Sequence, residues 1–163
     1  MKQFDPKQVT VEGTKFYIFP FPAFKAANLS GELAALIAPL LSSLGALIGS
    51  NDNLLDVNVE EAAPSIAGAF NSLSGDKLES LLKKLLIANK NITVEVEDED
   101  EPQRLTEDLA NEIFCGEVQG LFILAFEVIR LNFNGFFKKL GNLSGGAAEK
   151  MEKAMKTLSS TAS

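Results

Sequence analysis

Residues 117–140 of the chain read EVQGLFILAFEVIRLNFNGFFKKL. In a helix built from this stretch, apolar side chains occupy nearly every turn and fall on two faces. A few polar residues interrupt the pattern, namely Gln119, Glu127, Arg130, Asn132 and Asn134. A helix that is apolar on more than one face is buried on most sides in a globular protein. We therefore predict a long central helix over residues 117–140, with the other helices around it.

The same apolar stretch could in principle cross a membrane. A membrane-spanning helix needs about 20 mainly apolar residues. Four residues of the stretch, Glu127, Arg130, Asn132 and Asn134, would each be costly in the lipid interior. We therefore predict that the protein makes no membrane span.

Two segments alternate between apolar and polar residues, as strands with one buried face do. Residues 8–19 alternate around a turn at residues 12–14, which predicts a β-hairpin. Residues 92–97 alternate in the same way and are expected to add a third strand to that hairpin. The apolar members of the three strands are Val9, Val11, Phe16, Ile18, Ile92, Val94 and Val96.

Prolines suggest where two of the other helices begin. Pro22 suits the first turn of a helix over residues 23–48, and Pro39 should kink or split that helix. After a loop rich in Asn, Asp, Gly and Ser, a brief helix is expected to begin near Pro64. Each of these helices carries apolar residues at three- and four-residue steps, which gives it one inward face.

Capping residues predict two more helices. Ser74 can cap a helix that runs to about residue 89, and Thr106 can cap a shorter helix that runs to about residue 114. The predicted fold class is therefore α+β and mainly α. It is a helical bundle around the central long helix, with a small antiparallel sheet made of the N-terminal hairpin and the strand near residues 92–97.

Length and composition indicate one domain. The chain has 163 residues, of which 46% are hydrophobic and 23% charged, values typical of a folded protein with one core. Residues 1–141 are predicted to form this globular domain. Residues 142–163 are rich in Gly, Ser, Ala and Lys, and we expect them to form a flexible tail.

Charge and residue types argue against several classes of function. A net charge of −7 argues against nucleic-acid binding, which depends on clustered Lys and Arg. The chain has no histidine, so it cannot build a Ser-His or Cys-His nucleophilic site. No glycine loop of a phosphate-binding type is present in the sequence. We therefore predict a protein that is not an enzyme and that uses no cofactor.

The single cysteine and the first residues bear on location. Cys115 cannot form a disulfide within the chain, and we expect it to be buried or half-buried as a small apolar residue. Residues 1–6, MKQFDP, lack the apolar stretch of a signal peptide. Both observations favour a cytoplasmic protein.

The acidic residues 97–101 form the strongest run of charge in the chain. They could bind calcium in principle, but they lack the glycine and the terminal glutamate spacing of a hand-type loop. We therefore predict a solvated loop without a metal site. Such a loop could meet a positively charged partner.

Because the residue types disfavour catalysis and metal binding, recognition of another protein remains. The chain has twelve phenylalanines and no tryptophan, and the phenylalanines gather near residues 16–24 and 133–137. Core packing explains most of them, while exposed members would mark a binding surface. The predicted partner-binding residues are Phe21, Phe24, Asp98, Glu99, Asp100, Phe133, Phe136 and Phe137.

Two stretches of the chain resemble a known family. The first is YIFPFPAF at residues 17–24, which leads into SGEL at residues 30–33. The second is IFCGE at residues 113–117, which leads into AFEVI at residues 125–129 and the phenylalanines up to residue 137. Together they resemble the tail assembly chaperones of long-tailed bacteriophages, over most of residues 8–141.

The resemblance implies a viral protein made in the host cell cytoplasm. It implies binding to the tape measure protein, which the chaperone would keep soluble during tail assembly, and absence from the finished virion. In such systems an extended product of ribosomal frameshifting often recruits the tail tube protein. The family supplies no catalytic residues and no cofactor.

Two other interpretations remain open at this point. The chain could be a regulatory or scaffold domain that binds another phage or host protein. It could also be a small enzyme that uses Glu107, Asp108 and Glu112, which would require a pocket with shifted carboxyl pKa values. The oligomeric state is open too, with a homo-oligomer among the alternatives.

Overall fold

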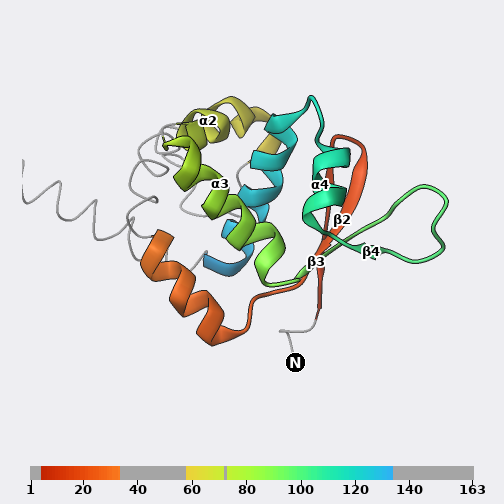
Figure 1. Ribbon diagram of the computed structural model, residues 1–163, viewed down its shortest axis with the longest axis horizontal. Coiled ribbons are helices and arrows are strands. Elements are labelled where there is room, and N and C mark those ends of the chain that lie inside the picture. Colours follow the sequence, from red (N-terminus) through yellow and green to blue (C-terminus); the bar gives the residue numbers. More distant parts are fainter. Residues whose placement is uncertain (1–4, 34–57, 72, 134–163) are drawn as a thin grey trace, which may run out of the picture.

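The computed structural model describes residues 5–33, 58–71 and 73–133 of the chain. Within these residues, four strands form one antiparallel sheet in the order β1-β2-β3-β4 (Figure 1). The strands are β1 (Lys7–Val11), β2 (Thr14–Ile18), β3 (Ile92–Val94) and β4 (Gln103–Arg104). The predicted fold class, α+β and mainly helical with a small antiparallel sheet, is confirmed.

The N-terminal hairpin forms as predicted. Its turn consists of Glu12 and Gly13, which have φ angles of 49° and 79°. Positive φ at both central residues is what a two-residue hairpin turn requires, because only this backbone twist matches that of the flanking strands. The turn sets the register that pairs Val9 with Phe16.

The strand predicted near residues 92–97 is confirmed in a shorter form, as β3, and pairs with β2. Alternation along the three longer strands places one set of side chains in the core, as the period of two demands. β4 was not predicted, because it has only two residues and both are exposed. These six side chains form the buried face of the sheet: Val9, Val11, Phe16, Ile18, Ile92 and Val94.

Helix α2 (Val59–Asn71) begins earlier than predicted. The prediction of a start near Pro64 was wrong, since Pro64 lies inside the helix. The side-chain oxygen of Asn58 accepts a hydrogen bond from the backbone N–H of Glu60 at 3.1 Å. Asn58 therefore caps the helix, and Glu60 and Glu61 suit its positive first turn.

Helix α3 (Gly75–Lys83) continues into the π-helical turn η3 (Lys84–Ala88), which confirms the helix predicted to about residue 89. Ser74 stands at its N-cap, but its side chain makes no capping hydrogen bond. Helix α4 (Glu107–Ile113) also matches its prediction. Here the Thr106 hydroxyl accepts a hydrogen bond from the Leu109 N–H at 3.2 Å, as a capping residue should.

Residues 118–133 are helical, and every residue from 124 to 130 is buried. This part of the predicted helix over residues 117–140 is confirmed, while residues 134–140 lie outside the described residues. Residues 23–33 are helical too. The predicted continuation to residue 48 with its kink at Pro39, and the predicted tail at 142–163, also lie outside the described residues. None of the described helices has the length and apolar character needed to cross a membrane.

Two pairs of stacked rings join distant parts of the core. Phe16 on β2 stacks on Phe114, which follows α4, with a centroid distance of 5.7 Å. Phe70 on α2 stacks on Phe122 of the 118–133 helix at 5.4 Å. Aromatic pairs of this kind add about 0.5–1.5 kcal/mol beyond the area that they bury.

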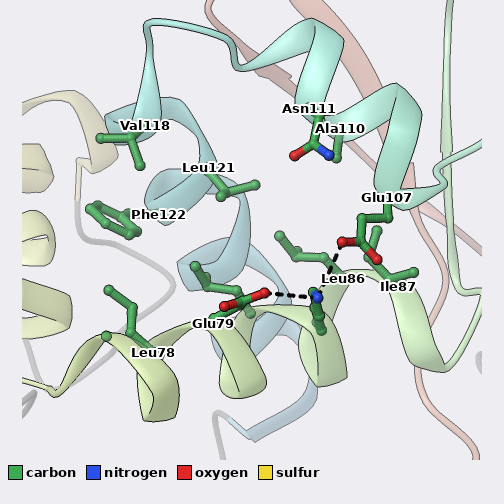
Figure 2. Close-up of a pocket in the computed structure, with 13 residues that line it drawn as sticks. Leu78, Glu79, Leu86, Ile87, Glu107, Ala110, Asn111, Val118, Leu121 and Phe122 are labelled. Atoms are coloured by element: carbon green, nitrogen blue, oxygen red, sulfur yellow. Dashed lines mark ion pairs between the residues drawn. The ribbon is translucent and has the colours of Figure 1, made fainter.

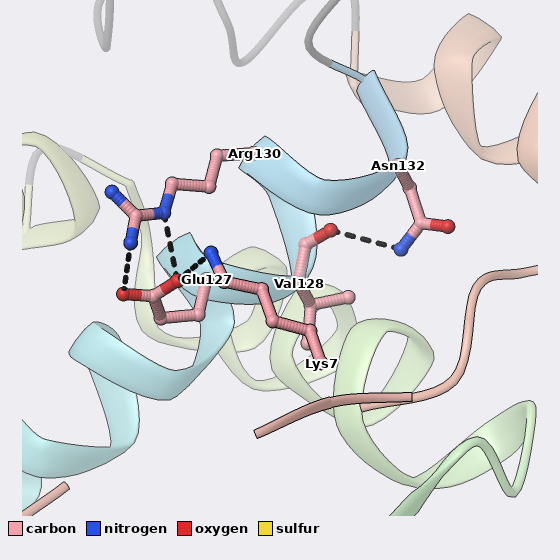
Figure 3. A network of polar contacts seen from close by, with 5 residues as sticks. All are labelled: Lys7, Glu127, Val128, Arg130 and Asn132. Atoms are coloured by element: carbon pink, nitrogen blue, oxygen red, sulfur yellow. Dashed lines mark hydrogen bonds and ion pairs between the residues drawn. The ribbon is translucent and has the colours of Figure 1, made fainter. Parts of the chain in front are cut away.

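A buried ion pair lies in the middle of the apolar 118–133 helix (Figure 3). The Arg130 guanidinium donates to the Glu127 carboxylate from Nε at 2.7 Å and from Nη2 at 2.8 Å. Lys7 on β1 donates to the same carboxylate at 3.1 Å. Glu127 therefore ties the first described strand to this helix.

A tight contact at Gly120 makes one substitution informative. A Cβ at this position would lie 3.0 Å from Cγ of Glu12 and 3.1 Å from the buried ring of Phe114. We expect Gly120→Ala to lower the free energy of unfolding by about 1–3 kcal/mol through overpacking, less the helix-propensity gain. Urea unfolding monitored by circular dichroism measures this change.

Gly68 provides the matched control for this change. It lies in α2, and a Cβ added there would meet nothing within 4 Å apart from its chain neighbours and the backbone of its own helix. Gly68→Ala is therefore expected to raise the free energy of unfolding by about 0.5–1 kcal/mol. If both substitutions changed the free energy of unfolding in the same direction, the tight packing at Gly120 would be contradicted.

Candidate functional site

An apolar groove lies between α3 with η3, α4, and the start of the 118–133 helix (Figure 2). Its volume is about 320 Å³. Aliphatic and aromatic side chains make up most of its wall, with a few polar groups at the edge. The lining residues are Gly75, Leu78, Glu79, Leu82, Lys83, Leu86, Ile87, Glu107, Ala110, Asn111, Val118, Leu121 and Phe122.

Helical spacing explains why these residues face the groove. Leu78, Leu82 and Leu86 recur every four residues along α3 and η3, and so share one side of the helix. Val118, Leu121 and Phe122 stand at i, i+3 and i+4 on the opposite wall. Val118 is 58% exposed, so it presents uncovered apolar surface beside the cavity.

Lys83 on α3 takes part in two ion pairs, one within α3 and one that connects α3 to α4 (Figure 2). The Lys83 ammonium lies 2.8 Å from Oε1 of Glu79 and 3.1 Å from Oε1 of Glu107. The hydrogen bond from Lys83 lowers the pKa of the Glu79 carboxyl. The hydrogen bonds to Glu79 and Glu107 raise the pKa of Lys83. This edge therefore carries two carboxylates that share one cation.

A smaller cleft of about 220 Å³ adjoins the groove. The two share Ala110, Asn111, Val118 and Leu121 in their walls, and the cleft adds Phe114 and Cys115. Cys115 is exposed, so the expectation of a buried or half-buried thiol was wrong. It stands in the turn between α4 and the 118–133 helix, where Gly116 with a φ of 79° reverses the chain.

Comparison with known proteins gives the family. Residues 12–146 match the family described as phage tail assembly chaperone protein, TAC. The chain belongs to this family. No curated protein and no solved structure shows a significant match to the chaperone. The resemblance noted from residues 17–33 and 113–137 is thereby confirmed.

Among the predicted partner-binding residues of the chaperone, two phenylalanines face its core. Phe21 is 7% exposed and Phe133 is 3% exposed. Their rings meet edge to face at a centroid distance of 6.3 Å and an interplanar angle of 63°. The Asn132 side chain fixes this contact, because its oxygen accepts a hydrogen bond from the Phe21 N–H at 2.7 Å. Both rings therefore serve packing in this structure.

The remaining predicted residues of the chaperone lie apart from that pair. Phe24 is 92% exposed in the first turn of the 23–33 helix. Asp98, Glu99 and Asp100 are exposed in the connection between β3 and β4, which extends away from the helices (Figure 1). Phe136 and Phe137 lie outside the described residues. Partner binding by this set stays a prediction.

The groove of the chaperone was not predicted as a site. The leucine stripe of α3 and the apolar residues at 118–122 indicate inward-facing surfaces, but a stripe does not reveal whether another element covers it. The one sign in the sequence was Val118, an apolar residue at the first position of the helix. Its exposure could not be read from periodicity.

The carboxylates considered for an enzyme do not converge in the chaperone. Glu107 lines the groove and pairs with Lys83, whereas Asp108 and Glu112 are exposed on α4. Among the described residues, no group of His, Cys, Asp or Glu side chains is arranged to hold a metal ion.

Proposed function

We propose that this chaperone binds the tape measure protein of its phage and keeps that chain soluble in the host cytoplasm during tail assembly. The observation that supports this proposal is the open apolar groove on a member of the tail assembly chaperone family. A long helical client with apolar faces aggregates unless those faces are covered. A groove lined by leucines offers such cover, and a net charge of −7 helps to keep the complex in solution.

Co-expression tests this function directly. The tape measure protein of the same phage is produced with and without the chaperone, and its soluble fraction is measured after centrifugation. We expect the soluble fraction to rise several-fold, and the two proteins to copurify on a tag placed on the chaperone. The genes should also be neighbours, with the chaperone gene between a tail tube gene and a very long tape measure gene.

An unrelated acidic protein of similar size serves as the control for co-expression. A soluble fraction that does not rise above this control would count against the proposal. Capture of a different phage or host protein in its place would favour a scaffold or regulatory domain. Mass spectrometry of purified virions should detect the tape measure protein but not the chaperone, since the proposed role ends with assembly. Recruitment of the tail tube protein by a frameshifted product stays a prediction.

A further inference from the structure

We propose that the groove between α3, α4 and residues 118–122 takes a short amphipathic helix whose apolar face carries large aliphatic side chains and whose flanks carry lysine or arginine. This inference rests on the proposed function, because the helix would be a segment of the tape measure protein. It adds the surface that binds and the chemistry of the segment that is bound. The length, the volume and the charge of the groove each support this occupant.

The length of the groove fits a helix of a few turns. Its wall on α3 and η3 extends from Gly75 to Ile87, and the lining residues on that wall share one face. At about 1.5 Å per residue, the eight steps of α3 from Gly75 to Lys83, where the ion pair with Glu107 bridges to α4, correspond to roughly 12 Å, or about two turns of a bound helix. A helix lying along α3 would bring residues at i, i+3 or i+4, and i+7 to the floor.

The volume of the groove fits apolar side chains. A cavity of roughly 150 Å³ lined by Leu, Ile and Phe can hold a benzene ring. The 320 Å³ of the groove therefore provides room for about two large aliphatic side chains. Val118 is positioned to contact the incoming helix, since more than half of its surface is uncovered. Covering such surface contributes about 25 cal/mol for each Å² of apolar area.

The charges around the groove favour a basic partner. Glu79 and Glu107 already hold a cation between them, the ammonium of Lys83. The side chains of Lys83 and Glu107 are 45% and 55% exposed, so an incoming lysine or arginine can reach the same carboxylates. Among the residues that line the groove, these two carboxylates outnumber the single ammonium, so the lining has a net negative charge. Complementary charge of this kind selects partners and speeds their encounter.

Two synthetic helical peptides test the assignment with the full chain. Both carry leucines along one face, while the flanking positions are lysine in one peptide and glutamate in the other. Fluorescence anisotropy of the labelled peptides measures affinity at two salt concentrations. We expect the lysine peptide to bind at least about tenfold more tightly than the glutamate peptide, and to weaken as salt rises.

Variants of the chain locate the binding. Val118→Lys should weaken binding of the lysine peptide about tenfold, because the new side chain fills part of the groove and adds a positive charge there. The position is exposed, so it tolerates a polar side chain. Gln8→Lys is the control, since it adds the same charge at an exposed position on β1 that does not line the groove. Its affinity should stay within about twofold of the original chain. Circular dichroism and thermal unfolding show that each variant is folded.

Several results would overturn the inference. They are equal binding of both peptides, an affinity that Val118→Lys leaves unchanged, or no binding by the full chain. Binding would also be absent if the groove were already filled, either by a second copy of the chain, which light scattering detects, or by the chain's own residues. The co-expression assay separates this failure from that of the proposed function. If Val118→Lys raises the soluble tape measure protein as well as the original chain does, only the groove assignment is wrong.

Discussion

Replacing Phe16 by alanine is expected to lower the free energy of unfolding by about 3–5 kcal/mol. Phe16 is fully buried at the middle of β2, where it faces Val9 on one neighbouring strand and Val94 on the other. Its ring also stacks on Phe114. The substitution removes the stacking and leaves a cavity where sheet and helices meet. Urea unfolding followed by far-ultraviolet circular dichroism measures the loss.

Phe24→Ala is the matched control for this prediction. It deletes the same atoms from a side chain that is 92% exposed, so its effect on stability should stay within about 0.5 kcal/mol. Phe16→Leu should lose less stability than Phe16→Ala, because much of the volume is kept. Similar losses for Phe16→Ala and Phe24→Ala would show that the sheet does not close the core as described.

Removal of the Glu127 carboxylate should have an effect of similar size. Glu127 and Arg130 are 5% and 9% exposed, and Lys7 reaches the same carboxylate from β1. Glu127→Ala removes the carboxylate to which Arg130 donates from two nitrogens, and loss of one partner of a buried ion pair costs about 3–5 kcal/mol. The midpoint of urea unfolding, with its slope checked for constancy, reports the change.

Replacement of both partners separates charge burial from packing. The double variant Glu127→Leu with Arg130→Met removes both buried charges and keeps most of the volume. Its stability should be nearer to that of the original chain than the stability of Glu127→Ala, because apolar residues can replace a buried ion pair with little loss. Glu99→Ala, on the exposed β3–β4 connection, controls for loss of a carboxylate alone. A loss of under about 1 kcal/mol for Glu127→Ala would contradict the structural role of the pair.

Local patterns explain most of the fold that could be predicted. The alternation of residues 8–19, the leucine stripe of α3 and the Thr106 cap each depend on neighbours in sequence, and each appears in the structure. The predicted start of α2 was wrong because proline suits a first helical turn, whereas Asn58, whose side chain caps the helix, ends a polar stretch that is typical of a loop. β4 could not be found, because two exposed residues contain no periodicity.

Contacts between residues distant in the chain could not be predicted from the sequence. Glu127 and Arg130 interrupt an apolar helix, and their spacing of three does not show that Lys7 joins them. Phe21 and Phe24 belong to one aromatic cluster in the sequence, yet one is buried and the other is almost fully exposed. The groove depends on how three helices meet, and no single helix contains that information.

The contact between Lys7 and Glu127 has a consequence for the order of events on the ribosome. The two residues are 120 positions apart, and the bond from Phe21 to Asn132 spans 111. The first two strands leave the ribosome long before β3 and the helices that cover them. A hairpin of two strands is only marginally stable alone. Closure over such separations slows folding. The protein that is proposed to shield another chain from aggregation thus has an exposed, vulnerable stage during its own synthesis.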